Sequence, residues 1–196
     1  MTMNNSNTKI TPAHSTGLRY FSTFELILLA LFSSLVVVDK IVLHLPLDIP
    51  GHSGVTWMAI LIVARGLVPK TGALSLVGLT SGLLAAFLGL GDLGAIYTVF
   101  SYLASGVAVD IIALFLGGVE QIMPAALAGT VGNVAKMLIK TAMAILLQIP
   151  AGFVALGLLY SFFTNAMAGL LGGILGWLIL RALRRAGFFV FLAEKR

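Results

Sequence analysis

The sequence contains no cysteine, and only 10% of its residues are charged. The absence of cysteine excludes disulfide bonds, thiolate metal sites and cysteine nucleophiles. Hydrophobic residues make up 59% of the chain, which is well above the share found in soluble domains and excludes an ordinary water-soluble core. The composition therefore predicts an integral membrane protein.

Short catalytic motifs are also missing. The chain has no H-E-x-x-H zinc motif, no G-x-S-x-G nucleophile elbow and no Walker A phosphate loop. We therefore expect neither enzyme activity nor a resident cofactor, and any transport must draw its energy from an ion gradient or another chain. The net charge of +5 does not indicate nucleic-acid binding, because the basic residues follow a membrane rule.

Apolar runs divide the chain into six expected membrane helices, since about 20 residues suffice to cross a bilayer. These helices are expected at about residues 21–38, 55–68, 71–90, 93–116, 123–148 and 153–183. Residues 1–20 are expected to form a disordered, uncleaved cytoplasmic tail, and residues 186–196 a basic, interfacial tail. The predicted fold class is an all-α polytopic membrane protein, with one six-helix domain over residues 21–185.

The positions of lysine and arginine predict the orientation, because cytoplasmic loops are enriched in both. Nine of the twelve basic residues lie in the tails or in the second loop: Lys9, Arg19, Arg65, Lys70, Arg181, Arg184, Arg185, Lys195 and Arg196. Lys40 alone falls in an expected outer loop. This distribution predicts an even number of spans with both termini in the cytoplasm, and hence a multi-pass protein of the cell membrane.

The stretch 128–148, within the expected helix 123–148, carries Asn133, Lys136 and Lys140. Their spacing of i, i+3 and i+7 places them on one stripe of a helix. A charged group inside hydrocarbon costs roughly 2.5 to 3.5 kcal/mol on insertion scales, so it normally faces a cavity or a partner. The stripe is therefore a candidate ligand site, although lysines that reach to the interface or pair structurally remain an alternative.

Aromatic and amide side chains are expected on the same outer side. They are Trp57, Tyr97, Tyr160 and Asn165. With the lysines they would form a pocket with aromatic walls and a basic floor, which suits a small, flat or carboxylate-bearing solute. An interfacial aromatic belt is the alternative interpretation of these rings.

Two further polar features have open roles. The loop that contains His44, Asp48 and His52 is expected outside, where Asp48 and His52 are candidate substrate contacts. The same three side chains suit nickel, cobalt or zinc, although loop prolines with a solvated histidine pair are the commoner explanation. Asp110 lies near the inner end of its span, so we expect it to contact a neighbouring helix, or to stay protonated, rather than to pair with Lys136.

Small residues at helical spacing predict where helices pack closely. Gly78 and Gly82 form one such face. The overlapping pairs Gly169/Gly173 and Gly172/Gly176 form two more, and Ala30 and Ser34 form a small pair in the first span.

The order of these features resembles the substrate-binding S component of an energy-coupling factor (ECF) vitamin transporter. The resemblance covers residues 21–185 and rests on Ala30 and Ser34 and on segments 66–89, 102–111, 132–136 and 168–185. It implies a binding subunit without its own ATPase, which joins a transmembrane coupling protein and two cytoplasmic ATPases. It also implies that Ala30 and Ser34 meet the coupling protein. Cobalt and nickel relatives use a histidine at the extreme amino terminus, whereas this chain begins MTMNNSN.

Three other functions remain as alternatives. A proton-coupled secondary transporter would use Asp110 and Lys136 as a proton relay. A subunit for cobalt or nickel uptake would use the histidine loop. A membrane enzyme lacks a credible nucleophile or acid/base pair here. The sequence does not identify the nutrient.

Overall fold

The computed structural model describes residues 20–42, 54–91, 94–147 and 151–187. These ranges form six helices, α1 (Thr23–Val42), α2 (Gly54–Leu67), α3 (Ala73–Phe87), α4 (Ala95–Phe115), α5 (Ile122–Leu146) and α6 (Ala151–Arg185). The all-α prediction is therefore confirmed for the described ranges. The two predicted tails, apart from Tyr20 and residues 186–187, lie outside them, as does the loop with His44, Asp48 and His52.

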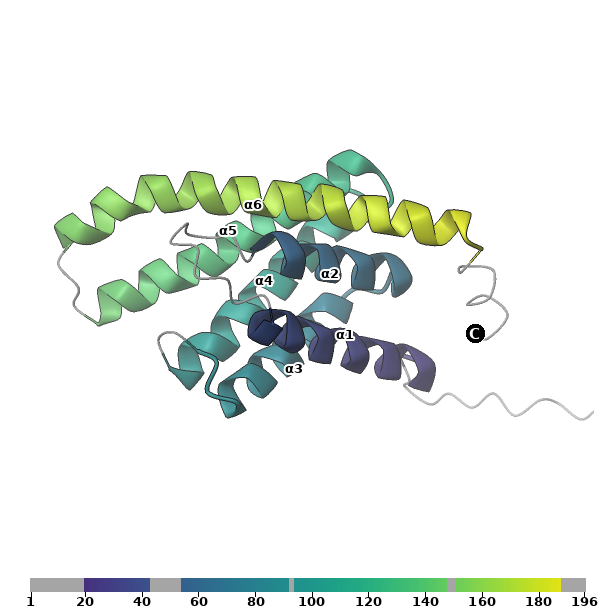
Figure 1. Cartoon of the computed structure of the whole chain (residues 1–196), viewed down its shortest axis with the longest axis horizontal. Helices are drawn as coiled ribbons and strands as arrows, with labels where there is room; N and C mark the ends of the chain where they lie inside the picture. The colour runs from purple at the N-terminus through teal and green to yellow at the C-terminus, as the bar shows by residue number, and fades with distance from the viewer. Residues whose placement is uncertain (1–19, 43–53, 92–93, 148–150, 188–196) are drawn as a thin grey trace, which may run out of the picture.

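Successive helices run in alternating directions (Figure 1). The start of α1, the α2–α3 turn, the α4–α5 turn and the end of α6 consequently lie together, and we name this region the terminal end. The other end of the bundle is named the opposite end. Because the first and last described residues share one end, the helix order agrees with an even number of crossings.

Three of the helices in the described ranges are long and apolar enough to cross a membrane, namely α4, α5 and the stretch Gly157–Arg185 of α6. Helices α2 and α3 are apolar but have only 14 and 15 residues, or roughly 21 to 23 Å at 1.5 Å per residue. Helix α1 has 20 residues but includes Glu25, Asp39 and Lys40. Membrane crossing by these three shorter or more charged helices therefore remains a proposal.

Helix α1 is longer than predicted. We expected the apolar run to end at Val38, but α1 continues to Val42 and holds Asp39 and Lys40 in its last turn. The Thr56 hydroxyl of α2 donates a hydrogen bond of 3.0 Å to the Asp39 carboxylate. A polar side chain with a partner on a neighbouring helix does not have to end the helix.

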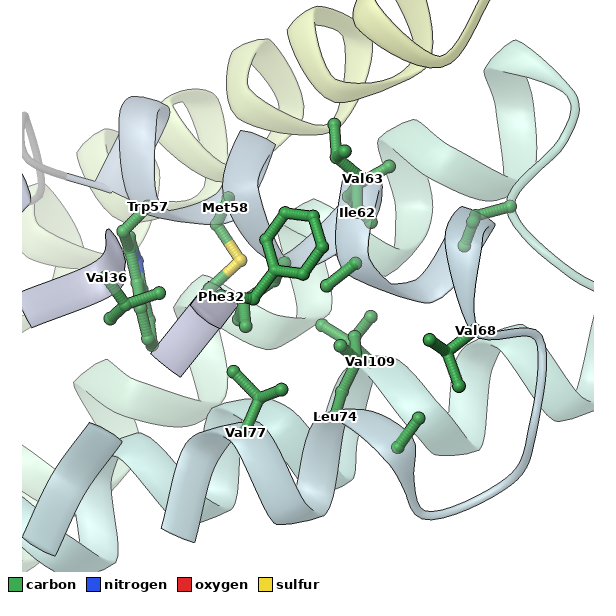
Figure 2. Close-up of a cluster of buried hydrophobic side chains, with 14 of the residues drawn as sticks. Phe32, Val36, Trp57, Met58, Ile62, Val63, Val68, Leu74, Val77 and Val109 are labelled. Atoms are coloured by element: carbon green, nitrogen blue, oxygen red, sulfur yellow. The ribbon is translucent and has the colours of Figure 1, made fainter. Parts of the chain in front are cut away.

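Helix α2 occupies the centre of the bundle, and 11 of its 14 residues are buried. Figure 2 shows its side chains in the apolar core, to which the neighbouring helices also contribute. The core includes Phe32 and Val36 of α1, Met58 and Ile62 of α2, Leu74 and Val77 of α3, and Val109 of α4. The shortest helix is thus the one that its neighbours cover most completely.

The overlapping glycine pairs of α6 pack against two different helices. A methyl group added at Gly173 would collide with the Ala125 carbonyl of α5, and one at Gly169 would collide with the carbonyl of Gly129. A methyl group at Gly172 would lie 2.6 Å from the Val55 carbonyl oxygen of α2, on the other side. The prediction that both pairs serve close packing is therefore confirmed.

Glycines also bring α3 and α4 together. A methyl group at Gly78 would lie 2.5 Å from the carbonyl oxygen of Tyr102, and one at Gly82 would lie 3.0 Å from the Cα of Val99. The predicted packing face of α3 is confirmed, and its partner is α4.

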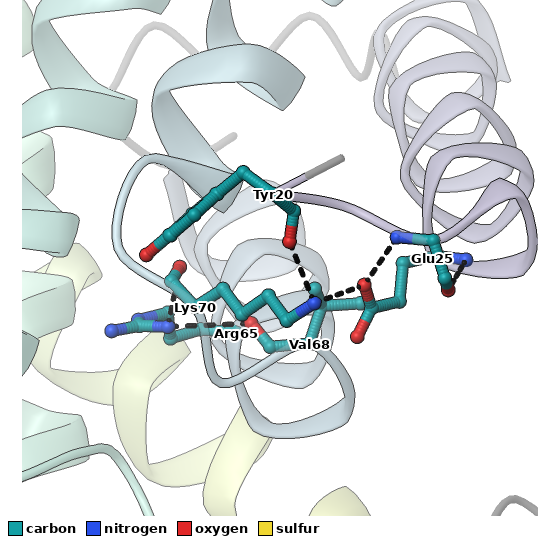
Figure 3. A network of polar contacts seen from close by, with 6 residues as sticks. Tyr20, Glu25, Arg65, Val68 and Lys70 are labelled. Atoms are coloured by element: carbon teal, nitrogen blue, oxygen red, sulfur yellow. Dashed lines mark hydrogen bonds and ion pairs between the residues drawn. The ribbon is translucent and has the colours of Figure 1, made fainter. Parts of the chain in front are cut away.

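The terminal end is tied by a network around Lys70 (Figure 3). Ser22 and Glu25 cap α1 reciprocally, because the Ser22 N–H donates to Glu25 Oε2 at 2.8 Å and the Glu25 N–H donates to Ser22 Oγ at 3.2 Å. Lys70 Nζ lies 2.6 Å from the same Glu25 oxygen and donates to the Tyr20 carbonyl at 2.8 Å. The start of α1 is thereby joined to the α2–α3 turn.

A buried ion pair lies beside this network. Arg65 Nε is 3.5 Å from Asp110 Oδ1, and both side chains are about 95% buried. The other Asp110 oxygen accepts hydrogen bonds from the Ser75 N–H at 2.8 Å and the Ser75 hydroxyl at 2.9 Å. Gly72 precedes α3 and has no side chain to cap it, so Asp110 of α4 supplies the negative charge at the start of α3.

Candidate functional site

The candidate site is centred on Lys136 of α5. Its ammonium nitrogen lies 4.4 Å from the ring centroid of Trp57 and 5.1 Å from that of Tyr102. The two ring centroids are 5.1 Å apart with the planes tilted by 57°. Helices α2 and α4 therefore present two aromatic faces to a cation on α5, an arrangement that stabilises the cation by about 0.5 to 2 kcal/mol per ring.

Burial separates the roles of these three side chains. Trp57 is 3% exposed and Tyr102 is 4% exposed, whereas Lys136 is only partly buried. The rings are covered by the bundle, so they hold the lysine rather than offer their faces to a solute. Lys136 is the member of this cluster whose side chain is not fully buried.

Asn133 lies one turn before Lys136 and is 1% exposed. Its side-chain oxygen accepts a hydrogen bond of 3.4 Å from Trp57 Nε1, and its side-chain nitrogen donates to the backbone oxygen of Asn165 at 2.8 Å. A methyl group at Gly54 would collide with the Asn133 amide, so only glycine leaves room for it there. The amide thus fixes the tryptophan and joins α2, α5 and α6.

Asp39 adds a carboxylate to the same neighbourhood. It is held by Thr56, and it lies close enough to Lys136 for the two opposite charges to attract. The sequence prediction omitted Asp39, Thr56 and Tyr102 from the site. Asp39 directly follows the first expected helix, residues 21–38, and this position at the helix end is a signal that could have linked it to the lysine.

Several predicted site residues lie elsewhere. Lys140 is on the exposed surface of α5, and Tyr160 is 57% exposed on α6. Tyr97 is buried near the start of α4, but Tyr102 is the tyrosine beside Lys136. Asn165 contributes its backbone oxygen, while its side-chain amide donates to the Ser161 carbonyl of the preceding turn at 2.7 Å.

The histidine loop cannot be assigned to the site. Asp48 and His52 lie outside the described residues. Within residues 20–42, 54–91, 94–147 and 151–187, no group of three His, Cys, Asp or Glu side chains is arranged to hold a metal ion.

Asp110 belongs to a different part of the bundle. It lies eight residues after Tyr102 on α4, which corresponds to roughly 12 Å along the helix axis. The prediction that it contacts a neighbouring helix rather than Lys136 is confirmed by its bonds to Ser75 and its pairing with Arg65. A cavity of about 220 Å³ near this pair opens at the terminal end and is lined by Arg65, Thr71, Ala113 and Glu120, among others.

Ala30 and Ser34 are exposed on the outer face of α1. Larger apolar side chains lie around them, including Leu31 and Leu35, which are 63% and 45% exposed. The Ser34 hydroxyl donates to the Ala30 carbonyl at 3.1 Å, so its hydrogen-bonding capacity is satisfied within the helix. This face has a shallow small-residue strip on which another helix can pack closely.

The Lys136 cluster places one ammonium group against two aromatic rings. An ammonium group held by two rings donates charge-assisted hydrogen bonds to an anion or to a strong acceptor. The neighbouring amide and carboxylate are engaged in fixing the helices, as their bonds to Trp57, Asn165 and Thr56 show. Comparison of the chain with protein-family models, with curated proteins and with solved structures finds no match.

Proposed function

We propose that the chain is the substrate-binding membrane subunit, or S component, of an ECF importer for a vitamin or similar small organic nutrient. The observation that carries this proposal is the partly buried Lys136 of an apolar bundle, whose ammonium lies against the rings of Trp57 and Tyr102. A charge is costly at such a position and is commonly retained there for a ligand or an ion path.

The proposed topology has six membrane-spanning helices with both termini in the cytoplasm. The alternating helices and the shared terminal end support it. So does the concentration of Arg65, Lys70, Arg181, Arg184 and Arg185 at that end. The short α2 fits this arrangement because its neighbours, rather than lipid, surround most of its surface.

The proposed partners are a transmembrane coupling protein and two cytoplasmic ATPases. The sequence has no phosphate-binding loop of its own, and the exposed strip of Ala30 and Ser34 on α1 supports close contact with a partner helix. Small residues such as these let the backbones of two helices approach closely.

The proposed substrate bears a carboxylate, a phosphate or a strong acceptor group that faces Lys136. The test is to purify the protein in detergent, release bound compounds by denaturation and identify them by mass spectrometry. Purified Lys136→Met should release none of the compound. Lys140→Met removes a charge from the exposed surface of the same helix and should release as much of the compound as the wild type. Release of equal amounts of the compound by the wild type and by Lys136→Met would contradict the proposal.

Transport of the released compound then distinguishes an importer from a secondary transporter. Uptake in cells should require the ATPases and the coupling protein. Uptake by the lone chain in liposomes under a proton gradient would overturn the importer proposal. The position of Asp110, held by Arg65 and Ser75 away from the lysine cluster, disfavours that alternative.

A further inference from the structure

The last two turns of α6 carry three arginines in different surroundings. Arg184 Nη2 lies 2.9 Å from Glu120 Oε1, so its charge is paired. The guanidinium of Arg181 lies over the ring of Trp177, with its central carbon 5.3 Å from the ring centroid. Among the described residues, no carboxylate forms an ion pair with Arg181 or Arg185. Both side chains are exposed, so in the described part of the chain an external anion can approach them.

Arg181 and Arg185 line one hollow of about 550 Å³ on the surface of α6. The hollow is completed by Leu178, Ala182 and Ala186. The five positions recur at i, i+3, i+4, i+7 and i+8, so they form one face of the helix. This face combines two guanidinium groups with an apolar floor.

The same face continues along α6 as an apolar strip. Leu171, Leu175 and Leu178 are 51%, 38% and 48% exposed. The opposite faces of α6 carry the glycines that pack on α5 and α2, so the strip points away from the bundle. Helix α6 ends at the terminal end (Figure 1), so the strip leads from the arginine pair toward the other end of the bundle. A basic pair above an exposed apolar strip is complementary to an anionic amphiphile.

We propose that Arg181 and Arg185 bind the phosphate of an anionic phospholipid of the surrounding bilayer, whose acyl chain lies along Leu178, Leu175 and Leu171. Guanidinium and phosphate groups form parallel, charge-assisted hydrogen bonds. Each basic residue near an anionic membrane surface strengthens binding by about fivefold. This site is separate from the Lys136 cluster and does not depend on which nutrient the protein binds.

The fluorescence of Trp177 reports on lipid bound at this site. The chain has only two tryptophans, and Trp57 is 3% exposed, so lipid chains do not reach it. The protein is reconstituted into bilayers that contain either phosphatidylglycerol or phosphatidylcholine with brominated acyl chains, and quenching of tryptophan fluorescence is measured against the fraction of brominated lipid. We expect brominated phosphatidylglycerol to compete about 5- to 25-fold better than brominated phosphatidylcholine, which corresponds to one or two arginine contacts.

The double variant Arg181→Gln/Arg185→Gln should reduce this preference to near unity. Arg184→Gln is the matched control, because it removes an arginine from the same turns but one that is already paired with Glu120; it should keep most of the preference. Equal quenching of the wild type by both lipids would overturn the proposal. So would a loss in Arg184→Gln as large as in the double variant, which would indicate general surface charge. Absence of quenching by either lipid would also overturn the proposal, because it would show that something other than lipid covers this face.

Discussion

Single residues in this protein show how a charge is accommodated inside an apolar bundle. Lys136 is held by two aromatic rings and is attracted by a nearby carboxylate. Arg65 is buried more deeply and is held by Asp110 and by the carbonyls of Val68 and Lys70, at 3.3 and 2.7 Å from Nη1. Lys136 is only partly buried, whereas Arg65 is buried, so the proposed ligand recognition involves the lysine and the arginine has a structural role.

Replacing Lys136 by Met tests the recognition role. The change keeps the apolar stem, and the thioether retains a favourable contact with the rings of about 0.3 to 1.5 kcal/mol. It removes a charge-assisted hydrogen bond worth about 1.5 to 3 kcal/mol, so affinity for the co-purified compound should fall about 10- to 150-fold. The melting temperature of the empty protein should change little. Affinity and melting temperature are measured on one preparation, with Lys140→Met as the control; a lower melting temperature with unchanged affinity would make the lysine structural.

Replacing Asp110 by Asn tests the structural role of the buried pair. The amide keeps an oxygen for Ser75 but leaves the guanidinium of Arg65 without its counter-charge, which costs about 3 kcal/mol in a buried setting. The matched control is Glu120→Gln, which breaks the exposed pair with Arg184 and should cost about 1 kcal/mol or less. Denaturation in detergent compares the two, and equal losses would refute the assignment.

At the scale of the helices, α6 and α1 use small residues for different purposes. The glycines of α6 are buried against α5 and α2 and set how closely these three helices approach. The small residues of α1 are exposed on the outer face of the bundle. Similar spacing therefore produces a buried packing face in α6, which we name the internal seam (Gly169, Gly172, Gly173 and Gly176), and an exposed face in α1, which we name the open strip (Ala30 and Ser34).

The internal seam should not tolerate a methyl group. In Gly173→Ala the added carbon would collide with the Ala125 carbonyl and lie 2.8 Å from the Cα of Ala126, and such overpacking costs about 1 to 3 kcal/mol. Gly157→Ala, on the same helix with no neighbour within 4 Å, should be neutral or stabilising by up to about 1 kcal/mol. Thermal unfolding of both variants is the measurement, and equal stability would show that α6 can shift to make room.

The open strip should be needed for assembly. In Ala30→Leu/Ser34→Leu the larger side chains would keep a partner helix at a distance, so pull-down of the coupling protein should be lost while the co-purified compound is still bound. Ala142→Leu, at an exposed position of α5, is the control and should assemble normally. An undiminished amount of coupling protein on the double variant would remove α1 from the proposed interface.

At the scale of the whole molecule, the terminal end gathers both described ends of the chain and most of the charged networks. The ties of Lys70 to Glu25 and Tyr20, and of Arg65 to Asp110, join α1, α2, α3 and α4 there. The Lys136 cluster lies toward the other end of the bundle, in α5 after the glycine contacts with α6. The charged networks that join the helices therefore lie at one end of the molecule, and the Lys136 cluster lies toward the other.

Cysteine labelling tests the proposed orientation, because the natural chain has no cysteine. A cysteine at Thr71, which is exposed in the α2–α3 turn, should be protected from an impermeant maleimide in whole cells and should react once the membrane is opened. A cysteine at Asp92, between α3 and α4, should react in whole cells. Reaction at position 71 from outside would contradict the cytoplasmic assignment of the terminal end.

The sequence by itself determined the helical class, the approximate bounds of the helices and the packing role of the glycines. These properties depend on local composition and on periodicity along one helix, which are readable without knowing the neighbours. It also singled out Lys136 and Asn133, since a polar stripe in an apolar helix is visible in one dimension.

Only the tertiary structure decided which side chains meet. Three residues join Lys136 and Asn133 although 31 or more positions separate them from Asn133 in the chain, namely Tyr102, Thr56 and Asp39. Two others, Tyr160 and Lys140, point elsewhere although their residue types and spacing suited the site. The same holds for Arg65, which we placed in a loop and which instead finds its partner on α4. The physical reason is that the rotation of each helix about its axis depends on how it packs against its neighbours, and the sequence of one helix does not contain that angle.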